Sequence, residues 1–278
     1  MKNKKRRSAM LTQSIDLDYA RSSRLLLPTV EKIALVLVGC GGTGSWLAPS
    51  VVRVGKLLQE KFGKRVQLVF VDPDRVEAKN CYRQNFCRAE IGHSKADVLA
   101  FRYGLVWGME VSARCEEFAQ NTFAYCNDQV ICIGCVDNAK ARKSIQEAAS
   151  RRTWWLDCGN SKSSGQVLLG CGASEPHNAF ELPGFCSWLP LPTEQHPELL
   201  EEDKGVILAE ENLSCADMAM VDSQGLAINQ RMAAEASDYL VRMLITKDLR
   251  KYATYIDLES GTCKSKYIVD MVNCKIDL

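Results

Sequence analysis

Residues 33–44, with the sequence Ile-Ala-Leu-Val-Leu-Val-Gly-Cys-Gly-Gly-Thr-Gly, decide the fold of this chain. Their unbroken apolar start is typical of a buried parallel strand. Gly39, Gly41 and Gly44 then let the backbone turn tightly, so that its N–H groups and a helix expected over residues 45–58 approach a phosphate. A Gly-x-Gly-x-x-Gly string is stronger evidence for a phosphate site when, as here, it follows an expected strand and precedes an expected helix. We therefore predict a nucleotide phosphate site, with a ligand-free tight turn as the alternative.

Asp72 follows a second apolar run, residues 66–71, which predicts a neighbouring strand. A carboxylate in this place accepts hydrogen bonds from ribose hydroxyls in dehydrogenases and in ATP-using enzymes alike. Asp72 therefore predicts a nucleotide without saying which chemistry it serves. A simple turn residue at a strand end is the alternative.

Asp137 and Asn138 end a further apolar run, residues 130–136. Because oxygen ligands and bound phosphates are the normal surroundings of Mg²⁺, Asp137 is a candidate metal ligand. The competing role is the N-cap of a helix expected over residues 139–150, and Asn138 is able to fill that role instead.

Asn80, Arg83 and Lys95 distinguish between the kinds of nucleotide chemistry. An enzyme that attacks the α-phosphate of ATP must stabilise growing negative charge, and fixed cations and donors do so. Arginine offers a planar fork and lysine a point charge. These residues favour ATP chemistry over hydride transfer, although an isolated Lys95 would be taken for an ordinary exposed helix lysine.

The remaining pattern alternates strands with helices, which predicts an α/β fold: a Rossmann-like, mostly parallel sheet with helices on both faces. Residues 1–30 form a polar N-terminal lead-in, and residues 31–278 form one domain. Within it, residues 172–213 show no sustained period and are expected to be a long crossover loop. Further strands are expected over 111–118, 153–157, 165–170, 253–258 and 266–272, the last two as a C-terminal β-hairpin, and helices over 95–107 and 214–245, with a break near Gly225.

Charge and cysteine content limit the classes of protein. A formal net charge of +1 on 278 residues implies no strong field toward nucleic acid or a membrane surface, and no apolar run is long enough to span a bilayer. The 13 cysteines are odd in number and follow no signal peptide, so they do not predict a disulfide framework. We expect a reducing, cytoplasmic setting.

Five motifs, taken together, carry a family resemblance. They are Gly39-x-Gly41-Gly42-x-Gly44, Asp72-x-Asp74-x-Val76, Asn80-x-x-Arg83-Gln84, Ile91-Gly92-x-x-Lys95 and Val136-Asp137-Asn138 with Arg142. This chain of motifs resembles the ubiquitin-activating-enzyme-like superfamily, whose bacterial members include ThiF, MoeB and HesA. The resemblance covers about residues 33–245. It is strongest to ThiF-type proteins encoded beside bacterial ubiquitin-like and conjugating-enzyme-like genes, including PRTRC clusters.

The resemblance implies adenylation of the C-terminal carboxylate of a ubiquitin-like protein, with ATP and Mg²⁺ as cofactors. By position, Asp72 would bind ribose, Asp137 would serve Mg²⁺, and Arg83 and Lys95 would act on the phosphates. The nucleotide-binding set implied in this way is Gly39, Gly41, Gly42, Gly44, Asp72, Asp74, Asn80, Arg83, Gln84, Lys95, Asp137 and Asn138.

Many members of the superfamily then transfer the acyl group to a cysteine after the crossover loop, and Cys215 lies at the matching place. A helix N-terminus stabilises a thiolate, although Asp217 nearby opposes the effect. Cys186 is the alternative nucleophile, and a small buried hydrophobe is the alternative role. Transfer to a conjugating-enzyme-like protein and sulfur-carrier activation without conjugation both stay open.

The resemblance also implies a homodimer, in which Arg21 or Arg24 would reach a phosphate of the partner subunit. Several relatives hold a structural zinc with two Cys-x-x-Cys pairs, but here that spacing occurs only at Cys132 and Cys135, inside an expected buried strand. Residues three apart on a strand face opposite sides, so we predict no zinc. None of the three histidines is assigned a role.

Two other functions compete with adenylation. An NAD-dependent oxidoreductase would use the glycine loop and Asp72, but it leaves Arg83, Lys95 and Asp137 unexplained. A non-catalytic docking subunit would keep the fold without turnover, although the full set of nucleotide-site residues argues against it.

Overall fold

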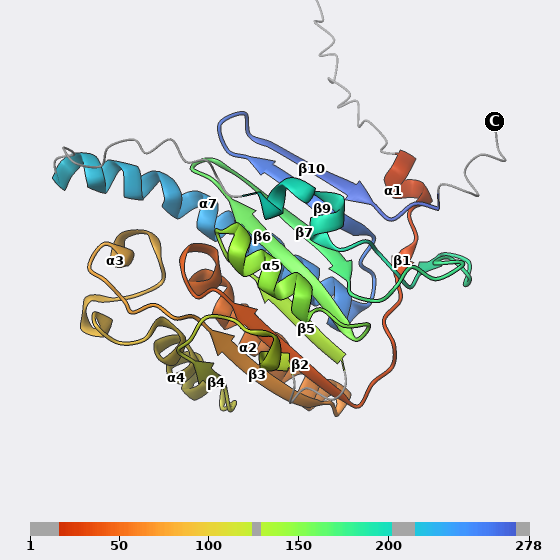
Figure 1. Cartoon of the computed structure of the whole chain (residues 1–278), viewed down its shortest axis with the longest axis horizontal. Helices are drawn as coiled ribbons and strands as arrows, with labels where there is room; N and C mark the ends of the chain where they lie inside the picture. Colours follow the sequence, from red (N-terminus) through yellow and green to blue (C-terminus); the bar gives the residue numbers. More distant parts are fainter. Residues whose placement is uncertain (1–16, 124–128, 202–214, 271–278) are drawn as a thin grey trace, which may run out of the picture.

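A single eight-stranded sheet forms the centre of the protein in the computed structural model, which describes residues 17–123, 129–201 and 215–270 (Figure 1). The strand order is β10-β9-β7-β6-β5-β2-β3-β4. The strands are β2 (Lys32–Val38), β3 (Arg65–Val71), β4 (Ser112–Arg114), β5 (Gln129–Gly134), β6 (Thr153–Asn160), β7 (Ser164–Cys171), β9 (Lys251–Asp257) and β10 (Thr262–Tyr267). Pairings from β4 through β6 are parallel and those from β6 through β10 antiparallel. The predicted Rossmann-like fold class is confirmed.

Helices cover both faces of the sheet, because its central strands are apolar on both sides. In β2, Leu35 and Leu37 belong to one buried cluster while Val36 and Val38 belong to another on the opposite face. The first cluster includes side chains of α2 (Gly42–Phe62), α4 (Lys95–Trp107) and α7 (Cys215–Val241), and the second includes those of α5 (Ala139–Ala148). In Figure 1, α5 lies in front of the sheet and α2 behind it.

Short elements complete the fold. They are α1 (Leu17–Arg21), β1 (Arg24–Leu25), α3 (Asn80–Arg83), the 3₁₀ turns η1 (Arg88–Glu90), η2 (Gln120–Phe123) and η3 (Pro197–Leu200), β8 (Phe185–Cys186), α6 (Pro192–Gln195) and a π-helical turn, η5 (Arg242–Thr246). No helix among the described residues has the length and apolarity needed to cross a membrane.

The crossover segment is more ordered than its sequence predicts. Up to residue 201 it contains β8, α6 and η3, and β8 pairs in parallel with β1 of the lead-in. His196 Nε2 lies 2.6 Å from the hydroxyl of Tyr255 on β9, and His196 Nδ1 lies 2.7 Å from Glu198 Oε1. The pairing of β8 with β1 and the contact between His196 and Tyr255 join segments far apart in sequence, so no local period reveals them. The rest of the expected loop, residues 202–213, lies outside the described residues.

Several expected boundaries were wrong. The expected strand over residues 111–118 shortens to β4 because it is an edge strand that pairs only along three residues of β3. The strand expected to stop at residue 157 continues to Asn160 because β7 pairs with it antiparallel. The hairpin begins earlier than expected, at Lys251. The α7 helix passes through Gly225 without a break.

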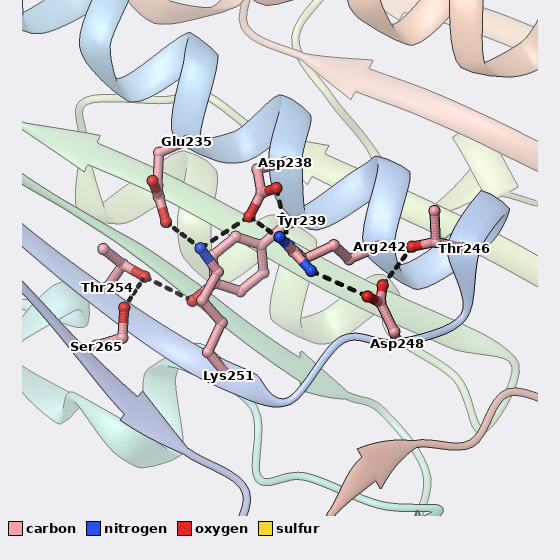
Figure 2. Close-up of polar contacts among 9 residues, drawn as sticks. All are labelled: Glu235, Asp238, Tyr239, Arg242, Thr246, Asp248, Lys251, Thr254 and Ser265. Atoms are coloured by element: carbon pink, nitrogen blue, oxygen red, sulfur yellow. Dashed lines mark hydrogen bonds and ion pairs between the residues drawn. The ribbon is translucent and has the colours of Figure 1, made fainter. Parts of the chain in front are cut away.

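A polar network fastens the C-terminal part of α7 to β9 (Figure 2). Lys251 Nζ lies 2.6 Å from Glu235 Oε1 and 2.9 Å from Asp238 Oδ2. Burial lowers the pKa of Lys251, but its bonds to both carboxylates outweigh that effect and raise it. The hydroxyl of Tyr239 lies 3.0 Å from that of Thr254. These contacts therefore hold the C-terminal part of α7 against β9.

Candidate nucleotide-binding site

A pocket of about 610 Å³ lies at the carboxyl ends of β2, β3, β5 and β6. This is where ligands bind in open α/β sheets. The residues of the predicted nucleotide site that line it are Gly39, Gly41, Gly42, Asp72, Asp74, Asn80, Arg83, Gln84, Lys95, Asp137 and Asn138. The structure therefore brings together side chains that span about a hundred residues of sequence.

The glycine loop is shaped by close backbone approaches. Gly39 has φ +88°, and a Cβ there would lie 2.5 Å from the carbonyl oxygen of Cys135. A Cβ on Gly42 would lie 2.5 Å from Asn229 Oδ1. Gly44 does not line the pocket: its own Cβ would lie 1.9 Å from the Gly39 carbonyl oxygen, so it lets the helix pack under the loop. Because α2 begins at Gly42 rather than at residue 45, its N-terminus opens directly into the pocket.

Asp72 is buried at the end of β3 and is held in one orientation. Its Oδ2 accepts a hydrogen bond from the Cys40 N–H at 2.6 Å, and its Oδ1 accepts one from the Asp74 N–H at 2.8 Å. Burial raises the pKa of Asp72, while these two hydrogen bonds and Lys95 act against the increase. The carboxylate is thus tied to the glycine loop on one side and to the β3 turn on the other.

Lys95 is the first residue of α4 and is buried, so the alternative of an ordinary exposed helix lysine is wrong. Its Nζ lies 2.7 Å from Asp74 Oδ2. Ser94 caps the helix by accepting the Asp97 N–H at 3.3 Å. The cap fixes the start of α4 and with it the lysine that points into the pocket.

Arg83, Asn80 and Gln84 reach the pocket from α3 and the residue after it. Asn80 Oδ1 accepts the Glu77 N–H at 2.8 Å, which closes the turn before the helix. Trp46 Nε1 on α2 donates to the Arg83 carbonyl oxygen at 3.2 Å. Gln84 Oε1 is buried and has no hydrogen-bond partner among the described residues. A buried acceptor of this kind is available to accept a hydrogen bond from a ligand.

Asn138 fills the capping role that the sequence left open between it and Asp137. Asn138 Oδ1 accepts the Ala141 N–H at 2.8 Å and caps α5. Asn138 Nδ2 also donates to Asp137 Oδ1 at 3.2 Å, and Asp137 is exposed in the pocket wall. In the described part of the chain no group of three or more His, Cys, Asp or Glu side chains is placed to hold a metal. A single carboxylate suits Mg²⁺, which takes most ligands from phosphates and water.

A buried ion pair supports the strand end that carries Asp137. Arg142 donates from Nε to Asp157 Oδ1 at 3.3 Å, and its guanidinium also donates to the Val136 carbonyl oxygen at 2.8 Å. Asp157 is fully buried in β6, and burial raises its pKa to about 6, with Arg142 acting against the increase. The neighbouring Cys158 lines the pocket.

Sequence reasoning missed several pocket residues. Among them are Thr43, Glu117, Phe118, Lys140, Asn160, Lys162 and Asn229. Asn160 had a usable signal, because it ends a strand beside the others that supply the site. Asn229 comes from the middle of α7, and its signal was a polar residue in an otherwise apolar helix face.

The cysteine and arginine candidates lie elsewhere or outside the description. Cys215 is the first residue of α7, but its side chain lies outside the described residues. Cys186 is buried in β8, where burial raises its thiol pKa to about 11, which makes it a poor nucleophile. Arg21 and Arg24 belong to α1 and β1 and are not among the pocket-lining residues.

The fold and the pocket define a Rossmann-like α/β protein with a glycine-loop site. The sequence model of the ThiF family matches residues 20–180, more than half of the chain, and the protein therefore belongs to the ThiF family. Comparison with curated proteins gives no significant match.

Solved structures show the same fold at low identity. PaaA matches with a TM-score of 0.53 and 15% identity over 86% of this chain and 64% of its own. E. coli MccB, crystallised with AMPCPP and MccA, matches with a TM-score of 0.52 and 14% identity over 86% of this chain and 65% of its own. This chain thus spans slightly less than two thirds of each of these two proteins.

Proposed function

We propose that this protein binds ATP in the pocket and adenylates a carboxylate at the C-terminus of a protein or peptide, with residues 31–278 working as one adenylation domain. The observation that carries the proposal is the meeting of Asp72, the glycine loop, Arg83 and Lys95 in one pocket. Membership of the ThiF family and the likeness to MccB, crystallised with AMPCPP and MccA, support it.

The pocket has the features that ATP requires. The N-terminus of α2 and the glycine loop offer backbone N–H groups to phosphate oxygens. Each Asp72 oxygen keeps a lone pair for a ribose hydroxyl after its backbone hydrogen bond. The unpartnered Gln84 Oε1 is a further acceptor. Mg²⁺, if bound at Asp137, would supply positive charge to the phosphates.

In the proposed reaction an oxygen of the substrate carboxylate forms a bond to the α-phosphorus of ATP. The bond between that phosphorus and the bridging oxygen of pyrophosphate breaks, which gives an acyl adenylate and pyrophosphate. Arg83 and Lys95 stabilise the negative charge that develops on the phosphoryl oxygens. Because Lys95 is paired with Asp74 at 2.7 Å, it is already desolvated and held in place before the nucleotide arrives.

We propose a ubiquitin-like protein as the substrate, followed by thioester formation on Cys215 and transfer to a conjugating-enzyme-like protein. The position of Cys215 at the start of α7 supports this, because a helix N-terminus favours the thiolate. A homodimer is the expected assembly. Sulfur-carrier activation without conjugation is the alternative, and it would leave Cys215 unused.

Pyrophosphate exchange tests the first step. The protein is incubated with ATP, Mg²⁺, labelled pyrophosphate and candidate ubiquitin-like proteins, and we expect label in ATP. Lys95→Ala should slow the exchange at least about a hundredfold, because one lost electrostatic donor typically raises the barrier by about 3 kcal/mol. Lys61→Ala, on the exposed side of α2, is the matched control and should keep full activity.

Exchange that Lys95→Ala leaves unchanged would contradict the assigned role of that lysine. Tight binding of nicotinamide cofactors, with no exchange for any partner, would instead favour the oxidoreductase. ATP binding without exchange would favour a docking subunit.

The covalent step is tested separately with Cys215→Ala. The variant should keep pyrophosphate exchange but lose any adduct with the partner that a reducing agent cleaves, because a thioester needs the thiol. The adduct is measured by non-reducing electrophoresis and mass spectrometry. An adduct that persists in the variant would show that another residue is the nucleophile.

A further inference from the structure

Asn229 is the polar member of an apolar stripe on α7. The buried residues beside it on the helix include Ile228, Met232, Ala233, Ala236 and Leu240. Asparagine is a poor helix former because its amide competes with the backbone for hydrogen bonds. Its burial within a long helix therefore needs a compensating interaction.

That interaction is a pair of hydrogen bonds that cross the pocket wall. Asn229 Oδ1 accepts a hydrogen bond from Asn160 Nδ2 at 3.0 Å, and Asn229 Nδ2 donates to the Arg83 carbonyl oxygen at 3.4 Å. The amide also lies directly over the glycine loop, since a Cβ on Gly42 would come within 2.5 Å of Asn229 Oδ1. Both ends of the amide are thus used at the rim of the phosphate site.

Asn160 extends the connection to a fourth segment. It is the last residue of β6, and its Oδ1 accepts a hydrogen bond from Thr43 Oγ1 at 3.3 Å. Thr43 lies in the first turn of α2. The two amides therefore link α7, the end of β6, the start of α2 and the main chain that carries the Arg83 guanidinium. All four of these residues line the pocket.

We propose that Asn229 is a positioning residue that couples α7 to the ATP phosphate site. This inference rests on the proposed function. Through its two bonds the amide holds the Arg83 main chain and, by way of Asn160, the start of α2 at the spacing that phosphate binding requires. The network around Lys251 fastens the opposite end of the helix to β9.

Coupling of this kind acts in both directions. A nucleotide that binds at the glycine loop and Arg83 also favours the observed position of Asn229 and with it of α7, the helix that begins with Cys215. A change in α7 in turn alters affinity for ATP. Adenylation at one end of the pocket and acyl transfer at the start of the helix are thereby linked by one side chain.

The test compares ATP affinity by calorimetry in the wild type, Asn229→Ala, Asn160→Ala, the double variant and Gln230→Ala. Gln230 is the exposed neighbour on α7 and is the matched control. Each single alanine change should weaken ATP binding by about fivefold to tenfold, as expected for lost hydrogen bonds near 1 kcal/mol each. The double variant should lose little more than either single variant, because both belong to one connection.

Asn229→Asp distinguishes a role beside the ATP phosphates from a purely structural role in packing α7. It keeps the acceptor for Asn160 but places a negative charge beside bound phosphates, so it should weaken ATP binding more than Asn229→Ala does, and most at low salt. In exchange assays the KM for ATP should rise in these variants while the KM for the carboxylate partner stays constant. Thermal unfolding of each variant identifies any loss that is due to misfolding.

The outcomes separate the two proposals. A wild-type protein that binds no ATP overturns the proposed function and this inference together. Wild-type binding with Asn229→Ala equal to Gln230→Ala overturns the positioning role alone. Fully additive effects of the two asparagine changes also overturn it, because independent residues would then act on ATP. If Asn229→Ala does not fold, Asn160→Ala still breaks the same bridge from β6, and unchanged ATP affinity in that variant overturns the proposal.

Discussion

Replacing Asp157 with asparagine tests the electrostatics beneath the pocket. The carboxyl group is fully buried in β6 and accepts a hydrogen bond from Arg142 Nε at 3.3 Å. Its Oδ2 has no hydrogen-bond partner among the described residues. Burial raises its pKa from the ordinary 3.8 to about 6, and Arg142 offsets only part of that increase.

The raised pKa of Asp157 sets the sign and the size of the pH dependence of stability. Because the folded state holds this proton more tightly than the unfolded chain does, the stability from the group is fully present below about pH 4 and is lost as the pH rises through about 6. A difference of about two pKa units corresponds to about 3 kcal/mol. About 2 kcal/mol of that loss falls between about pH 4.5 and 8.

Urea unfolding of the wild type and Asp157→Asn across this pH range measures the loss. Asparagine does not titrate, so the unfolding free energy of the variant should gain about 2 kcal/mol relative to the wild type between about pH 4.5 and 8. Glu175→Gln, at an exposed site, is the control and should follow the wild type. A difference between wild type and Asp157→Asn that stays constant with pH would refute the reasoning.

Two further substitutions test the loop and the crossover segment. Gly39→Ala should destabilise the protein by several times the cost of Gly63→Ala in urea unfolding: both glycines have positive φ, but only at Gly39 would the Cβ meet backbone, 2.5 Å from the Cys135 carbonyl oxygen. Equal costs would contradict this account. Tyr255→Phe removes the 2.6 Å contact with His196 and should cost about 1 kcal/mol and speed hydrogen exchange over residues 192–200. Unchanged exchange there would show that the contact does not hold the segment.

The sequence predicted those parts of the fold that depend on local pattern. Apolar runs located β2, β3 and β5, and the helix expected over residues 95–107 matches α4. Because parallel strands bring their carboxyl ends to one edge of a sheet, the predicted parallel sheet implied that Asp72 and Asp137 lie in one pocket. These predictions needed no tertiary contact.

The parts that the sequence did not reveal depend on distant partners. Gly225 was expected to break α7, yet the helix continues, and a Cβ there would lie 3.9 Å from Arg83 Cδ and from Asn229 Nδ2. Both are ordinary van der Waals distances, so the space around Gly225 does not require a glycine. Asn229 itself pairs with Asn160, which is remote in sequence, so only the folded structure shows why an asparagine stands in that helix.

The lead-in forms a seam of backbone hydrogen bonds with the end of the β-hairpin and with the crossover segment. Ser23 donates its N–H to Ile268 at 2.7 Å, Arg24 to Gly184 at 2.8 Å, and Leu26 to Cys186 at 2.7 Å. A version of the protein that starts at residue 31 would keep every strand of the large sheet. It would lose the hydrogen bonds to the residue after β10 and to the middle of the crossover segment. Tags and fusions at the N-terminus therefore belong ahead of this seam, because any effect of a shortened version includes the loss of these hydrogen bonds.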